Sequence, residues 1–188
     1  PIPPSPIVSC LGRFKNVNKA VPAHFQNNNS VILLIGERKN ELGGSVYYSL
    51  KNELGANVPK PNFEEVKNQI FALTDCIDSG LVLSCHDIAD GGIASALAEM
   101  TFRNSIGCNV NIKNDLSPDK ILFSETGGFI LEVLPKNIDT IKSVFSNYGL
   151  DVFDIGSTGG ESIEINGITD IYVNEIKKAW TNGLREKL

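Results

Sequence analysis

The chain has 188 residues, 41% of them hydrophobic and 21% charged, a composition typical of one soluble globular domain with a sizeable core. Its 17 Lys and Arg residues against 22 Asp and Glu residues give a net charge of −5. The charges are mixed along the chain, which argues against a nucleic-acid-binding face. The longest apolar run, residues 31–35, is far too short to cross a bilayer, and no signal-peptide pattern is present.

The cysteines indicate a reducing compartment. They lie at positions 10, 76, 85 and 108 and include no CxxC pair, so we expect no zinc site. Three of them lie in apolar surroundings, where a free cysteine behaves as a small hydrophobic residue. We expect free thiols and a cytoplasmic location, although four cysteines could in principle form disulfides.

The start of the chain predicts a linker. Residues 1–6 carry four of the nine prolines, which favours an extended segment. We assign residues 1–30 to a linker and leading segment and residues 31–188 to a single domain. Because the chain starts at Pro1, we expect a piece of a longer protein, a processed terminus being the alternative.

The first elements follow directly. The apolar run 31–35 predicts a strand covered on both faces or at a sheet centre. Leu42, Val46 and Leu50 are four residues apart and predict a helix, with Gly55 at its C-terminal cap.

A second, stronger helix pattern comes next. Asn62 with Glu65 resembles a capping box, and Gly80 ends the helix. Its apolar stripe consists of Phe63, Val66, Ile70, Leu73 and Ile77. Residues 81–85 then predict a strand.

The second half alternates in the same way. Its predicted elements are a helix with Ile93, Leu97 and Met100 on one face, strands at 110–112 and 129–134, a helix from Ile138 to Tyr148 ending at Gly149, strands at 152–155 and 162–165, and a helix with Val173, Ile176, Trp180 and Leu184. The strands at 152–155 and 162–165 read as a hairpin-like pair joined by Gly156 to Gly160, and Trp180 is expected in the core. The fold class is therefore α+β, one mixed β-sheet covered by helices.

The most informative stretch is residues 84–100, in which a strand, a polar turn and a helix start follow one another. Backbone N–H groups and the helix dipole favour an anion at such a helix start, and Gly91 and Gly92 would let it approach closely. The alternative is a tight turn with Asp90 as the helix cap.

Two glycine pairs beside acidic residues, Gly91-Gly92 and Gly127-Gly128, can either contact phosphate or form ordinary turns. Neither a P-loop nor a dinucleotide fingerprint is present, and Gly159-Gly160 reads as a turn. The candidate nucleotide- or phosphate-binding residues are Gly91, Gly92, Glu125, Thr126 and Gly127. Asp87 is the candidate Mg²⁺ ligand, because Mg²⁺ prefers one or two carboxylates with phosphate oxygens.

The positions of the two histidines do not indicate a catalytic centre. His86, at a strand end, reads as a hydrogen-bonded structural residue, although histidine titrates near neutrality. His24 has no acid or nucleophile pattern around it, and two histidines so placed make no catalytic triad. We therefore assign no catalytic residue to this chain.

The stretch from His86 to Met100 resembles the second C-terminal-type domain of phosphoribosylformylglycinamidine synthase. Further segments resemble that domain in the same order: residues 1–8, 33–37 with 41–45, 122–128 and 173–180. The resemblance implies the fold of the C-terminal domain of aminoimidazole ribonucleotide synthetase. Asp87 matches an aspartate that contributes to a metal site in the paired first-half domain, but this chain resembles the degenerate half. Relatives commonly carry an arginine after the glycine loop, where this chain has Phe129.

The resemblance also implies a function. The parent would be an ATP-dependent ligase that converts formylglycinamide ribonucleotide and glutamine-derived ammonia to the amidine, in purine biosynthesis. It would use Mg²⁺ and ATP or ADP, with the preceding domains and a glutaminase domain or subunit as partners. Since most of the catalytic apparatus lies in the preceding domains, the isolated chain would be inactive. The alternatives are the corresponding domain of aminoimidazole ribonucleotide synthetase, selenophosphate synthetase or thiamine-monophosphate kinase, and a free-standing binding or dimerisation module.

Overall fold

The structure, a computed structural model, describes residues 8–13 and 16–183. Its strands are β1 (Val31–Ile35), β2 (Val82–Asp87), β3 (Cys108–Val110), β4 (Phe129–Val133), β5 (Val152–Thr158), β6 (Ser162–Ile165) and β7 (Thr169–Tyr172). Its helices are α1 (Val46–Leu50), α2 (Phe63–Asp78), α3 (Gly92–Thr101), α4 (Pro118–Phe123), α5 (Ile138–Asn147) and α6 (Val173–Asn182), with 3₁₀ turns η1 (Val17–Lys19) and η2 (Pro135–Asn137). No helix of the described residues is long and apolar enough to span a membrane.

The strands form one mixed sheet in the order β2-β4-β1-β5-β3-β6-β7. The pair β3 and β6 is parallel, and the other strand pairs of the described residues are antiparallel. The predicted fold class is therefore confirmed.

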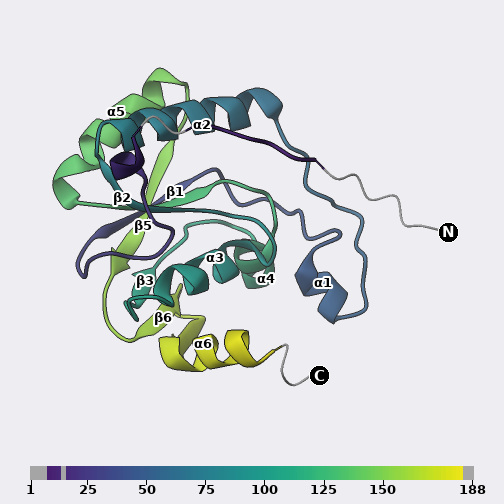
Figure 1. Ribbon diagram of the computed structural model, residues 1–188. Helices are drawn as coiled ribbons and strands as arrows, with labels where there is room; N and C mark the ends of the chain where they lie inside the picture. The colour runs from purple at the N-terminus through teal and green to yellow at the C-terminus, as the bar shows by residue number, and fades with distance from the viewer. Residues whose placement is uncertain (1–7, 14–15, 184–188) are drawn as a thin grey trace.

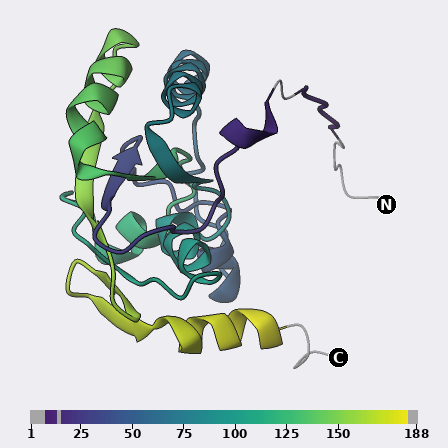
Figure 2. The ribbon, with the colours of Figure 1, turned by 60° about the vertical axis from the view of Figure 1, so that its left-hand side comes forward.

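Helices cover the sheet on both faces, and β1 shows why (Figures 1 and 2). Successive side chains of a strand point to opposite faces. Leu33 and Ile35 accordingly pack in the core beneath α2 and α5, whereas Ile32 and Leu34 pack in the core with α3, α4 and α6. All four are at most 2% exposed, as the apolar run of this strand predicts.

The predicted hairpin of residues 152–155 and 162–165 is wrong. Strand β3 lies between β5 and β6, pairing with β5 in the antiparallel and with β6 in the parallel sense. The partner of β6 at the sheet edge is β7, which the sequence analysis missed together with α4. Strand pairing is set by contacts distant in sequence, so local pattern did not reveal it.

Two helix predictions need correction. The helix at 42–50 begins only at Val46 and ends at Leu50, so Gly55 is not its cap. Leu42 is buried outside the helix, while Leu50 is 80% exposed. Trp180 is 65% exposed rather than in the core and packs on Phe102, with ring centroids 5.4 Å apart. Leu184 of the predicted stripe lies outside the described residues.

Helix α2 forms where predicted, but a different face of it is buried. The Asn62 side chain accepts a hydrogen bond from the Glu65 N–H at 3.3 Å, which confirms the N-terminal cap. The buried positions are Gln69, Ala72, Leu73 and Cys76. Phe63 is 81% exposed, so only part of the apolar stripe reaches the core.

The last part of the leading segment packs into the fold. Phe25 is fully buried in the core, and its N–H donates to the Met100 carbonyl at 2.8 Å. Further along, the Ser30 N–H donates to the Thr158 hydroxyl. The proline-rich residues 1–6 lie outside the described residues, and the domain boundary at residue 30 stays a prediction.

All four cysteines are free thiols. Burial raises the pKa of Cys76 to about 11 and of Cys85 and Cys108 to about 12, with a smaller contribution from Asp75 at Cys76 and Asp87 at Cys85. Cys10 is exposed. Because the thiolate is the reactive form, the three raised pKa values predict inert thiols.

In the native protein at about pH 8 we expect one fast thiol, that of Cys10, in a titration with an aromatic disulfide reagent. The other three should react only after unfolding, and Cys10→Ser should leave no fast thiol. Two or more fast thiols in the native protein would contradict this assignment of Cys10 as the reactive thiol.

The raised pKa values of the three buried thiols also affect stability. They stabilise the folded protein below the ordinary thiol pKa of 9, and this stabilisation is lost as the pH rises toward 11–12.

Candidate functional site

Three glycine-bearing segments, two of which carry the predicted site residues, meet at one end of the sheet. They are residues 43–46 before α1, residues 87–92 between β2 and α3, and residues 124–128 between α4 and β4. We term these segments the glycine junction. Two of them lie side by side because β2 and β4 pair with Asp87 opposite Phe129, and the Ile88 N–H donates to the Gly128 carbonyl at 2.9 Å.

Glu125 connects all three segments. Its Oε1 accepts the Gly91 N–H at 2.9 Å and the Val46 N–H at 2.8 Å. Carboxylate acceptors make hydrogen bonds roughly twice as strong as neutral ones. The N–H group expected to contact a phosphate therefore donates to a carboxylate of the chain itself.

Asp90 is not the cap of α3, which corrects the sequence-based interpretation. The N-cap is Gly91, in the left-handed region at φ 78°, and α3 has no side-chain cap. Glycine adopts this conformation without the penalty that other residues incur. Asp90 is exposed.

Close backbone approach explains two further glycines. A Cβ on Gly92 would lie 2.6 Å from the Leu122 carbonyl oxygen, and one on Gly128 would meet the Ile35 carbonyl oxygen. Both glycines also have positive φ. They let α4 and β1 pack closely against the junction, a structural role that the sequence analysis weighed as the ordinary-turn alternative.

Arg38 is the residue that the sequence analysis missed. It is 3% exposed, and its guanidinium donates from Nη1 to the Ser124 carbonyl at 3.2 Å and from Nη2 to the Gly127 carbonyl. Burial lowers the pKa of Arg38 to about 10, partly offset by the nearby Glu41 carboxylate. The loop of residues 124–128 thus receives a guanidinium from the segment after β1. Nothing in the neighbouring sequence marks Arg38 as buried.

The candidate metal ligand Asp87 lies at the end of β2 with its side chain 68% exposed. Neighbouring His86 lies with Nδ1 2.7 Å from the Asp87 carbonyl oxygen and Nε2 3.0 Å from Glu99 Oε2. This confirms His86 as a hydrogen-bonded residue of the strand end. Within the described part of the chain, no group of three or more His, Cys, Asp or Glu side chains could hold a metal.

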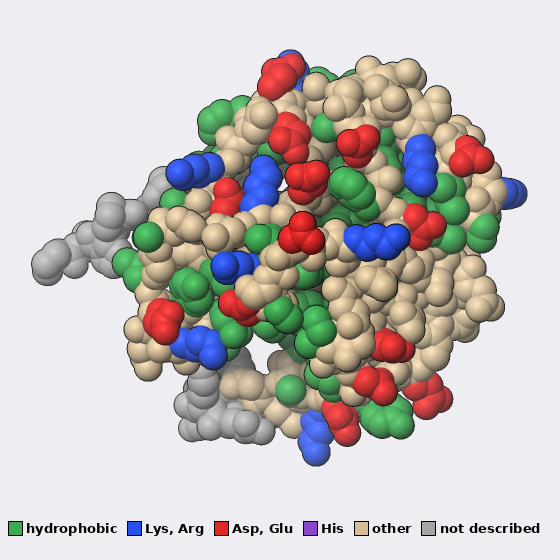
Figure 3. Space-filling model, turned by 180° about the vertical axis from the view of Figure 1, so that it is seen from behind, with side chains coloured by type: hydrophobic (Ala, Val, Ile, Leu, Met, Phe, Trp, Pro, Cys, Tyr) green, Lys and Arg blue, Asp and Glu red, His purple; other side chains and the backbone are tan. Residues whose placement is uncertain are grey.

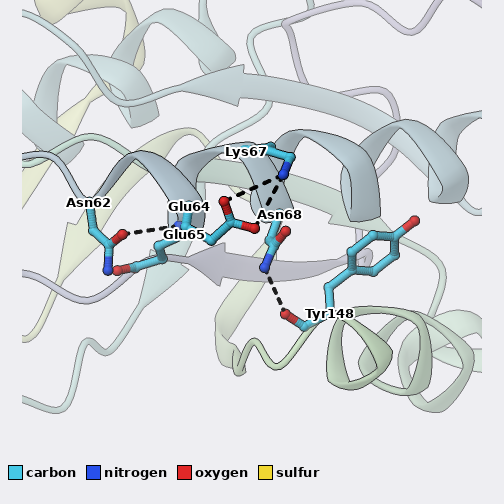
Figure 4. Close-up of polar contacts among 6 residues, drawn as sticks. All are labelled: Asn62, Glu64, Glu65, Lys67, Asn68 and Tyr148. Atoms are coloured by element: carbon cyan, nitrogen blue, oxygen red, sulfur yellow. Dashed lines mark hydrogen bonds and ion pairs between the residues drawn. The ribbon is translucent and has the colours of Figure 1, made fainter.

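None of the residues predicted for the site lines the two larger clefts described next. One, of about 420 Å³, separates α2 from the end of α5 and carries Glu37, Glu64, Glu65 and Asp151. Figure 4 shows its α2 wall, where the Asn68 side chain donates to the Tyr148 carbonyl at 3.3 Å.

A second cleft, of about 520 Å³, includes Arg38, Lys113 and Asp154. Of the predicted site residues, Thr126 and Gly127 line only a hollow of about 30 Å³, room for about one water molecule. The hydroxyl oxygen of Thr126 is buried without a hydrogen-bond partner.

A mixed seven-stranded sheet with helices on both faces and glycine loops at its strand ends defines an α+β domain. Residues 27–166 match the family described as AIR synthase related protein, C-terminal domain, and the chain belongs to this family.

The chain is similar to subunits named phosphoribosylformylglycinamidine synthase subunit PurL. It is 32% identical to that of Methanothrix thermoacetophila over all of the chain and 25% of the relative, and 34% identical to that of Thermoplasma volcanium over 97% of the chain and 24% of the relative. The chain thus spans about a quarter of the length of these relatives.

Among solved structures, Thermotoga maritima PurL complexed with FGAR matches with a TM-score of 0.74 at 17% identity, over 86% of this chain and 30% of that one. The same protein has also been solved with ATP and with ADP. At this identity, the likeness shows the shared fold.

Proposed function

We propose that this chain is the second C-terminal-type domain of a phosphoribosylformylglycinamidine synthase of the PurL type. The observation that carries the proposal is a 32% identical match over the full chain to a quarter of a PurL subunit. The parent would be a cytoplasmic ligase that makes the amidine from formylglycinamide ribonucleotide and ammonia, with the ammonia supplied by a glutaminase domain or subunit. ATP with Mg²⁺ would supply the phosphoryl group that activates the amide oxygen.

Within that enzyme, Asp87 is our proposed Mg²⁺ ligand. Its exposed carboxylate fits this ion, which takes most of its ligands from phosphate and water and needs only one or two carboxylates. Because this domain contributes a single such group, the other ligands would come from the nucleotide and from the preceding domains.

The geometry of the glycine junction supports a structural role rather than direct phosphate binding. Gly91 already donates its N–H to Glu125, so a phosphate could bind there only by displacing a carboxylate. We propose that Gly91, Gly92, Glu125, Thr126 and Gly127 form a wall of the nucleotide cleft and set its shape. This agrees with a domain that scaffolds the enzyme and contributes no catalytic residue.

Exposed apolar side chains support the existence of further domains. Leu50, Leu54 and Phe63, from α1 to the start of α2, are 80%, 78% and 81% exposed. Single exposed apolar residues are normal, but a run of them within one short stretch is typical of a contact surface. Hydrophobic side chains also reach the surface between charges on the face shown in Figure 3. We propose that preceding domains of the same enzyme cover the stretch from residue 50 to residue 70.

Two measurements on the isolated chain test the proposed function. We expect no ATP- and ammonia-dependent turnover of formylglycinamide ribonucleotide, and turnover by the chain alone would contradict the scaffold role. Calorimetric titration with Mg-ADP should show saturable binding that Asp87→Ala abolishes. The matched control, Asp90→Ala, removes an exposed carboxylate three residues away and should leave binding intact. Absence of binding to the unmodified chain would place the nucleotide site in the other domains and leave Asp87 a turn residue.

A further inference from the structure

We propose that Glu125 is a positioning residue. Its carboxylate occupies the position that an external anion would take in the glycine junction and thereby holds α1 against the start of α3. A single oxygen, Oε1, accepts backbone N–H groups from both helix starts, at 2.8 Å from Val46 and 2.9 Å from Gly91. Glu125 has this role whatever reaction the parent enzyme performs, because it depends only on these contacts.

Helix α1 needs such an anchor. It has five residues and buries none of them, and a helix this short is not stable without tertiary contacts. Its second attachment is the ring of Tyr47, which stacks on Phe123 with centroids 4.6 Å apart and planes 4° apart. Phe123 ends α4, two residues before Glu125, so both attachments come from the same short stretch.

The start of α3 needs an acceptor from outside the helix. Its N-cap is a glycine, which offers no side-chain oxygen to the free N–H groups of the first turn. A carboxylate at this position also interacts favourably with the helix dipole. Glu125 thus accepts the N–H of the N-cap residue itself, one of the free donors at the start of α3.

The loop presents Glu125 from a fixed backbone. Ser124 is buried, its carbonyl accepts from Arg38 and its hydroxyl donates to the Lys39 carbonyl at 2.6 Å. On the other side of Glu125, the Gly127 carbonyl accepts from Arg38 as well. The backbone on both sides of Glu125 is therefore held by one buried guanidinium, and an external anion must compete with the Glu125 carboxylate for the Gly91 N–H.

The test compares Glu125→Ala and Glu125→Gln with Glu175→Gln, a control that removes an exposed charge from the first turn of α6. Amide hydrogen exchange, followed by NMR, should be about tenfold faster at Gly91 and Val46 in Glu125→Ala. In Glu125→Gln, which keeps an oxygen acceptor without the charge, the exchange rates at these two amides should lie between those of Glu125→Ala and those of the Glu175→Gln control. Exchange at Leu33 in the sheet centre should not change in any variant.

Inorganic phosphate is the second probe. The Gly91 amide resonance of the unmodified chain should not shift saturably with phosphate, whereas that of Glu125→Ala should. Unchanged exchange at both amides in Glu125→Ala would overturn the proposal, as would equal phosphate responses with and without Glu125. Should Glu125→Ala fail to fold, the exchange rates of Glu125→Gln decide: equality with the control overturns the anchor role. Neither amide exchange nor the phosphate response depends on nucleotide turnover. Failure of the proposed role of Glu125 is therefore distinguishable from failure of the proposed function.

Discussion

Replacing Glu132 by alanine is expected to lower the free energy of unfolding by about 3–5 kcal/mol, because it removes three hydrogen bonds to one buried carboxylate and leaves the buried Ser84 hydroxyl without its acceptor. Glu132 lies in β4 and is fully buried. Its Oε2 accepts the Gln26 N–H at 2.7 Å and the Ser84 hydroxyl at 2.8 Å, and its Oε1 accepts the Asn27 N–H at 2.9 Å. The carboxylate therefore fixes the end of the leading segment to the sheet.

Urea unfolding monitored by circular dichroism measures the effect. Glu161→Ala, at an exposed position in the turn before β6, is the control and should change stability by less than about 0.5 kcal/mol. Glu132→Gln should also destabilise the fold, because its amide NH₂ faces donors where the carboxylate had a second acceptor. A loss below about 1 kcal/mol for Glu132→Ala would show that these donors find other acceptors.

Replacing Phe25 by alanine is expected to lower the free energy of unfolding by about 3–5 kcal/mol, because the missing ring leaves a cavity in the core. Phe25 is fully buried in the core with α3. The chain provides its own control in Phe63→Ala, since Phe63 is 81% exposed and the same atoms are removed. Similar losses for the two variants would mean that Phe25 does not belong to the core of the folded protein.

The two replacements should not be additive. Phe25 and the two backbone donors to Glu132 lie on neighbouring residues, so each replacement frees the same segment. Once Phe25→Ala has loosened this segment, Glu132→Ala has less to remove, and the double variant should lose less than the sum of the two. Full additivity would show that the two anchors act independently.

The spacing of apolar residues predicted the helices and strands well where neighbouring residues in the sequence are enough to define the element. The run 31–35 forms the interior strand β1, and Asn62 caps the start of α2 as predicted. Helix α5 ends beside Gly149, as predicted. These features depend on one residue and its near neighbours, so the sequence carries them directly.

Exposure was predicted less well. Apolar spacing placed Phe63 and Trp180 on buried stripes, yet both are largely exposed. Periodicity shows that a helix has an apolar face, but it does not show which other element covers that face, or whether this chain contains that element.

The candidate site shows the same division. The sequence by itself determined that two glycine pairs, Gly91-Gly92 and Gly127-Gly128, lie beside acidic residues at the ends of regular elements. Only the tertiary structure decided that these two segments meet residues 43–46, that Glu125 accepts from Gly91 and Val46, and that Arg38 lies buried behind residues 124–128. The physical reason is that the order of strands in the sheet, which brings residues 38, 46, 91 and 125 together, depends on pairings between distant parts of the chain. Local pattern fixes the faces of each element, whereas the packing of the whole chain fixes their neighbours.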